Sequence, residues 1–233
     1  MKTPLHNWNL PPKEAIELQI KLADKVSFTP LRKAPEFIAG LDCAFSRNGR
    51  YITAAAVVLR LPDLQLIETS AARQEIRFPY IPGLLSFREA PACIAAVEKL
   101  KNNPDVFIID GQGIAHPRRL GIASHLGLFL DKPAIGCAKS RLVGEFTAVP
   151  VEKGGWSPLT DSAHRGPTDQ LPFTAHQTIG AVVRTRTNVK PVFVSVGHKC
   201  TLDDAVRIVL ACTTRYRLPE PTRLAHQIVS RCR

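Results

Sequence analysis

The chain has 233 residues, 45% of them hydrophobic, which suits one sizeable domain with a packed core. Lys and Arg number 31 against 20 acids, so the formal net charge is +11. This balance favours a polyanionic partner, with nucleic acid ahead of an anionic membrane surface. No apolar run approaches the roughly 20 residues of a membrane span, and the N-terminal residues lack an apolar signal core.

The six cysteines form no CxxC pair and no paired metal-ligand spacing. Several lie inside apolar segments, where a free thiol behaves as a small hydrophobic group. We therefore expect reduced cysteines in a soluble cytoplasmic protein without a membrane partner. A single domain over residues 1–233 is expected, and nothing in the sequence indicates an obligate interface, which favours a monomer.

The first half of the chain predicts one helix and then three antiparallel strands. Residues 12–26 begin at a Pro-Pro pair and carry apolar residues on one helical face. The dipeptide Asn48-Gly49 is a strong hairpin signal between the first two strands. The expected strands are 36–45, 51–60 and about 64–78.

The second half alternates helices with strands, a pattern that predicts parallel neighbours. Helices are expected at 87–101, 119–130 and 202–214, and strands at 105–110, 133–138, 177–185 and 192–196. Residues 150–175, rich in Gly and Pro, predict an irregular excursion, and the C-terminal tail is basic. A three-strand antiparallel meander followed by parallel strands, all flanked by helices, is the order of a ribonuclease H-like mixed α/β sheet.

Two acids interrupt apolar strands in this scheme. Asp42 breaks the first strand, and Asp110 ends the fourth strand just before Gly111. In a ribonuclease H-like sheet these strands are neighbours, about 4.8 Å apart. Two carboxylates that close require a cation between them, and a divalent metal is the obvious candidate. The alternative is a pair of buried acids satisfied by backbone donors at strand ends.

Other candidate residues each have a plain structural alternative. Glu89 can face a metal, but Ser86 and Glu89 also form a capping-box pattern. Lys139 ends the strand beside Asp110, or is an ordinary exposed lysine. His116 follows Asp110 in the same loop and can act at a phosphate.

The loop 79–83 contains two prolines and one tyrosine. Stiffened by the prolines, Tyr80 can serve as a wedge that parts stacked bases. An ordinary proline-rich connection with a surface tyrosine is the alternative. Near the C-terminus, His198 ends the last strand, while Asp203 lies in the first turn of the next helix, where acids favour the helix dipole.

The motifs together closely resemble the endonuclease V family. The most specific are Pro-Tyr-Ile-Pro-Gly-Leu-Leu-Ser-Phe-Arg-Glu at 79–89 and Asp-Gly-Gln-Gly-Ile-Ala-His-Pro-Arg-Arg-Leu-Gly at 110–121. Shorter matches are Leu41-Asp42, Gly-Cys-Ala-Lys (136–139), Val-Gly-His-Lys (196–199) and Tyr-Arg-Leu-Pro-Glu-Pro-Thr-Arg (216–223).

The resemblance implies an endonuclease that flips inosine or another deaminated base out of DNA or RNA. Such an enzyme hydrolyses the second phosphodiester bond on the 3′ side, leaving 3′-hydroxyl and 5′-phosphate, with Mg²⁺ as cofactor and Mn²⁺ as a substitute. The implied metal ligands are Asp42, Glu89 and Asp110, with His116 and Lys139 at the catalytic site. The implied substrate-binding residues are Pro79, Tyr80, Ile81, Pro82, Gly83, Leu85, Gly111, Gly113, Gly121 and Leu142, and weaker matches fall on His198 and Asp203.

Two rival functions remain open at this stage. One is a nucleic-acid-binding protein without nuclease activity, attracted by the positive charge. The other is a different ribonuclease H-like nuclease, such as a junction or hybrid cutter, against which the loop 79–83 argues. The sequence does not distinguish DNA from RNA, or one metal from two.

Overall fold

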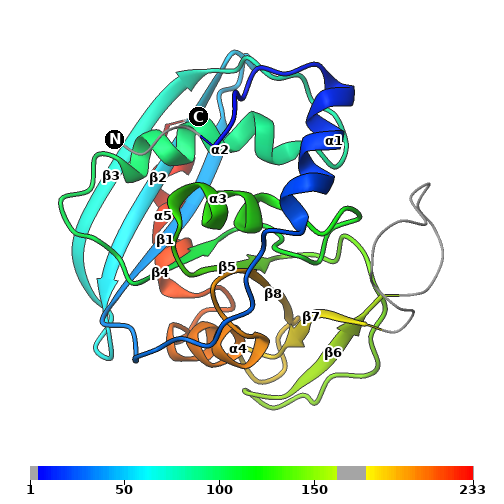
Figure 1. Cartoon of the computed structure of the whole chain (residues 1–233). Helices are drawn as coiled ribbons and strands as arrows, with labels where there is room; N and C mark the ends of the chain where they lie inside the picture. Colours follow the sequence, from blue (N-terminus) through cyan, green and yellow to red (C-terminus); the bar gives the residue numbers. More distant parts are fainter. Residues whose placement is uncertain (1–4, 162–176, 233) are drawn as a thin grey trace.

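The computed structural model describes residues 5–161 and 177–232. Within them the strands form one mixed sheet of eight, in the order β3-β2-β1-β4-β5-β8-β7-β6 (Figure 1). The strands are β1 (Phe37–Phe45), β2 (Tyr51–Arg60), β3 (Gln65–Glu75), β4 (Val106–Ile109), β5 (Ala134–Ala138), β6 (Trp156–Thr160), β7 (Thr178–Val183) and β8 (Val192–His198). The helices are α1 (Pro12–Ala23), α2 (Leu85–Val97), α3 (Ile122–Leu130), α4 (Leu202–Ala211) and α5 (Glu220–Ser230).

The predicted antiparallel meander is confirmed. β1 pairs antiparallel with β2, and β2 pairs antiparallel with β3. The turn between β1 and β2 contains Gly49 at a φ of +66°, a conformation that glycine adopts without a steric penalty. β3 ends at Glu75, slightly earlier than the sequence predicted.

The parallel centre of the sheet also agrees with the predicted ribonuclease H-like order. β1 pairs parallel with β4, and β4 pairs parallel with β5. Leu41 lies opposite Ile109 in this register, and the Asp110 N–H donates to the Leu41 carbonyl at 3.0 Å. The next residue on each strand is an acid, so Asp42 and Asp110 lie at neighbouring positions of adjacent strands.

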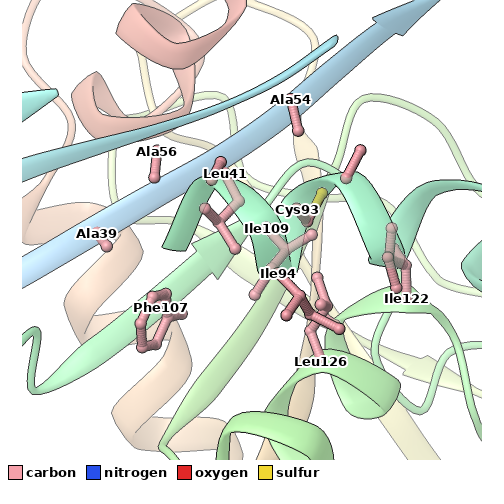
Figure 2. Close-up of a cluster of buried hydrophobic side chains, with 14 of the residues drawn as sticks. Ala39, Leu41, Ala54, Ala56, Cys93, Ile94, Phe107, Ile109, Ile122 and Leu126 are labelled. Carbon is pink, nitrogen blue, oxygen red and sulfur yellow. The ribbon is translucent and has the colours of Figure 1, made fainter. Parts of the chain in front are cut away.

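Helices cover both faces of the sheet and bury its apolar side chains. α2 and α3 lie against β1, β2 and β4 on one face, as Figure 2 shows for the cluster that includes Ala39, Leu41, Cys93, Ile94, Phe107, Ile109, Ile122 and Leu126. On the other face α4 packs on β4, β5, β7 and β8, while α5 packs on β1 and β2. None of the helices in the described ranges is long and apolar enough to cross a membrane.

Two elements depart from the sequence prediction. β6 lies inside the irregular excursion expected at about 150–175. Among the strands of the described residues it pairs only with β7, at the edge of the sheet, where a proline such as Pro158 is tolerated. Residues 162–175 of that excursion lie outside the described residues. The expected basic tail contains α5, which begins after Pro219 and buries Ala225 and Val229.

α5 is seated unusually close to β1. A Cβ atom on Gly40 would lie 2.1 Å from the backbone carbon of Pro221, closer than any real contact allows. Glycine is therefore required at this position for the first turn of α5 to lie on the strand. The same contact fixes where the following turns of α5 meet β1.

Gly40→Ala should lower the free energy of unfolding by at least about 2 kcal/mol, because backbone must move to admit the methyl group. Gly49→Ala is the matched control, since no atom lies within 4 Å of its added Cβ and its cost comes only from the φ of +66° in the hairpin turn. Urea unfolding of both variants tests this. Equal and small losses would contradict the tight seating of α5.

Candidate metal and catalytic site

Two carboxylates and one imidazole converge where β1 and β4 run side by side. Ligand atoms of Asp42, Asp110 and His226 all lie within 4.8 Å of one another. Asp42 comes from β1, Asp110 from the end of β4 and His226 from α5. Oxygen and nitrogen donors at this separation form a plausible divalent-metal site by their chemistry.

The electrostatics of Asp42 fit a site that accepts a cation. Burial raises the pKa of Asp42, and the negative charge of Asp110 raises it further. Hydrogen bonding from His226 and the charge of Lys139 act in the opposite direction. Like charges held this close favour a positive group between them.

His226 is the member of the site that the sequence analysis missed. Its Nδ1 lies 2.6 Å from Oδ2 of Asp42, while the Cys43 N–H donates to Oδ1 at 2.8 Å. Both oxygens of Asp42 are thus oriented by neighbours. The signal was the helical spacing of Leu224, Ala225, Ile228 and Val229, which identifies a helix and places His226 within it.

Lys139 lies at the site as predicted. It follows β5, and its Nζ atom donates to Oδ2 of Asp110. Its side chain keeps 40% of its surface exposed, so the ammonium group borders both the carboxylate and solvent. Lys139 is thus an exposed lysine at a strand end, as the alternative expected, and its ammonium group is also bonded to Asp110.

Glu89 is buried on α2 but is not part of the three-ligand group. Burial raises its pKa to about 7, with a hydrogen bond from Cys43 acting in the opposite direction and the charges of Asp42 and Asp110 adding to the rise. The capping-box alternative is wrong, because α2 begins after Leu84 and has no side-chain cap. The Ser86 hydroxyl instead pairs with His125 Nδ1 at 2.9 Å.

The loop after Asp110 is folded tightly against the sheet. A Cβ atom on Gly113 would lie 2.0 Å from the Val196 carbonyl oxygen, and one on Gly121 would lie 2.2 Å from that of Gln112. The N–H of Gly113 donates to the Ser195 hydroxyl at 2.8 Å. The glycines at 113 and 121 therefore allow this loop to pack closely against β8 and against itself.

His116 lies in this loop and is almost completely buried. Burial lowers its pKa to about 3, and the charge of Arg118 adds to that effect. The imidazole is therefore neutral at physiological pH in the protein without substrate, and in that state its ring nitrogens act as one hydrogen-bond donor and one acceptor.

Three of the other predicted substrate residues are exposed at the surface. Tyr80, in the loop between β3 and α2, is 72% exposed. Leu85, the first residue of α2, and Leu142, beyond β5, also keep large exposed surfaces. Exposed apolar side chains of this size are available for contact with a nucleic acid base.

His198 and Asp203 lie away from this edge. His198 pairs with Ala134, the first residue of β5, at the opposite end of that strand from Lys139. Its Nδ1 accepts a hydrogen bond from the Ser27 N–H at 3.1 Å. Asp203 is exposed in the first turn of α4, beside the Thr201–Asp204 capping box, as the helix-dipole alternative predicts.

The raised pKa of Glu89 predicts a pH-dependent stability when no divalent metal is bound. The folded state binds the Glu89 proton more tightly than the unfolded state does, so between pH 4.5 and 7 stability falls as pH rises. The contribution is on the order of 3 kcal/mol. Urea unfolding in EDTA at pH 5 and pH 8 should show a larger fall for the unaltered protein than for Glu89→Gln. Identical falls would assign the effect to other groups.

Comparison with known proteins identifies the family of this chain. The sequence model of the endonuclease V family matches residues 20–227. Proteins named endonuclease V from Dehalococcoides mccartyi and Methanothrix thermoacetophila are each 50% identical over 222 residues, which cover 95% of this chain and 94% and 92% of theirs.

Solved structures give the same result. The endonuclease V of Streptomyces avermitilis superimposes with a TM-score of 0.86 at 36% identity, covering 97% of this chain and 94% of that one. The endonuclease V of Ciona intestinalis, in complex with a 24mer DNA containing an inosine followed by a ribo-adenosine, gives 0.78 at 29% identity, covering 94% and 95%. This chain belongs to the endonuclease V family.

Proposed function

We propose that this protein is a metal-dependent endonuclease that cuts DNA or RNA beside inosine or another deaminated base. The observation that carries the proposal is the convergence of Asp42 and Asp110 at one sheet edge. The inosine-containing DNA bound by the relative from Ciona intestinalis supports the choice of substrate. The formal charge of +11 suits a nucleic acid partner.

Asp42 and Asp110 are the residues that we propose to hold the metal. Carboxylate oxygens suit Mg²⁺, and Mn²⁺ takes similar ligands and can replace it. A cation held there would lower the pKa of a water molecule and offset negative charge on the phosphate. The pKa of Asp42, raised by burial and by Asp110, is the property of this chain that supports the assignment.

The surrounding side chains have separate roles in this proposal. His226 orients Asp42 through the 2.6 Å contact at Nδ1. Lys139 carries a positive charge beside Asp110, where it can orient a water molecule toward the phosphate. Glu89 adds a third carboxyl group, whose pKa responds to both acids. His116 contributes hydrogen bonds as a neutral imidazole.

Substrate recognition in this proposal uses base flipping. In the wedge loop, which we define as residues 79–83, Tyr80 is the residue that would part the strands, and its exposure supports this role. A mispaired hypoxanthine leaves the stack more easily than a correctly paired base. The flipped base then meets Leu85, Leu142 and the backbone around Gly111, Gly113 and Gly121. The cut falls at the second phosphodiester bond on the 3′ side, leaving 3′-hydroxyl and 5′-phosphate.

End-labelled DNA and RNA oligonucleotides with one inosine test this function directly. With Mg²⁺ we expect a single cut one nucleotide beyond the inosine, no cut in EDTA, and at least a thousandfold loss in Asp110→Asn, about the effect of losing a main charge-stabilising group. Asp203→Asn is the matched control, since Asp203 is exposed on α4. Salt-sensitive binding without any cut would favour a binding protein. Cutting of junctions or hybrids without inosine would favour another ribonuclease H-like nuclease.

A further inference from the structure

The wedge loop is fixed at its C-terminal end by two side chains from distant segments. These are Gln19 and Arg118, and both donate to the carbonyl oxygen of Gly83, a residue with a φ of +78°. Nε2 of Gln19 donates to this oxygen at 3.0 Å, and a terminal guanidinium nitrogen of Arg118 donates at 2.7 Å. A carbonyl oxygen has two lone pairs, so its hydrogen-bonding capacity is filled.

Gln19 is the centre of this arrangement. It lies on α1, is 1% exposed, and its Nε2 also donates to the Leu120 carbonyl at 2.6 Å. Its Oε1 accepts from Nε of Arg118 at 2.5 Å. One buried amide therefore joins α1, the wedge loop and the loop 110–121, which carries the glycines proposed to receive the flipped base.

The other end of the wedge loop is fixed independently. A guanidinium nitrogen of Arg88 donates to the Phe78 carbonyl at 3.0 Å. The Phe78 ring is buried and stacks on Phe87 of α2, with the ring centroids 5.4 Å apart. Between these two anchors, Tyr80 is 72% exposed. The loop has fixed ends and a free aromatic tip.

We propose that Gln19 is a positioning residue for strand separation: it holds the wedge loop at a fixed place relative to the base pocket, without touching the substrate. The inference rests on the proposed function. Parting a duplex requires unstacking and unpairing, which cost a few kcal/mol. If the wedge loop is mobile, part of the free energy of binding to the duplex is used to order the loop. Less of that free energy then remains to separate the strands. An unpaired inosine in a single strand requires no strand separation.

Comparing duplex with single-stranded substrates distinguishes a positioning role of Gln19 from a merely structural one. If Gln19 only stabilised the fold, its loss would affect cutting of paired and unpaired inosine equally. If Gln19 holds the wedge, its loss reduces cutting of the duplex selectively. The ratio of kcat/KM for an inosine-containing DNA duplex to kcat/KM for the same unpaired strand is therefore the measured quantity.

Gln19→Met keeps the side-chain length and removes the three hydrogen bonds that Gln19 makes to Gly83, Leu120 and Arg118. The ratio should fall about tenfold, the effect of losing roughly one net hydrogen bond. Gln19→Glu keeps an acceptor for Arg118 but loses both donors, and should lower the ratio similarly. Arg118→Gln removes the other donor to Gly83 and gives a second test if the Gln19 variants do not fold. Val209→Ala, on the buried face of α4, is the control for stability loss and should leave the ratio unchanged.

Equal losses on both substrates, or an unchanged ratio in variants that fold, would overturn the inference and leave the proposed function intact. A ratio that falls in Val209→Ala as much as in Gln19→Met would also overturn it. If the unaltered protein failed to cut any inosine-containing strand, the proposed function itself would be refuted. A selective loss on the duplex, with the unaltered protein active on both, is the supporting result.

Discussion

The repulsion between Asp42 and Asp110 is the constraint on which the rest of the site depends. Parallel pairing of β1 with β4 fixes the backbone of both acids at neighbouring positions, so their carboxylates lie close together. Burial strengthens the repulsion because little water screens it. The site is stable only with positive or hydrogen-donating partners around these acids, and His226, Lys139 and the backbone of Cys43 supply them.

The fold brings those partners from distant parts of the chain. β5 places Lys139 beside Asp110 because it pairs parallel with β4. α5 places His226 beside Asp42 because Gly40 lets its first turn approach β1. The neutral His116 and the wedge loop depend on the segment after Asp110 instead. The proposed metal site thus depends on β5 and α5, and the proposed base-recognition residues depend on the loop that follows Asp110.

Much of this arrangement could be predicted from the sequence. Asp42 and Asp110 each break a short apolar run, and strand order alone places them together. His226 could not be found this way, because its partner is 184 positions away and α5 was taken for a basic tail. The neutrality of His116 depends on tertiary burial, which a loop sequence does not reveal. Glu89 matched a capping pattern, but the helix began at Leu85, before Ser86, the residue expected to cap it.

Metal binding measured without turnover tests the central claim most directly. Calorimetric titration of Mn²⁺ into the unaltered protein, Asp42→Asn, Asp110→Asn and Asp203→Asn separates the proposed site from the general charge of the surface. Our account predicts saturable binding in the unaltered protein and in Asp203→Asn, and at least about a tenfold loss of affinity in each of the other two. Unchanged affinity in both Asp42→Asn and Asp110→Asn would show that the two converging carboxylates do not hold the metal.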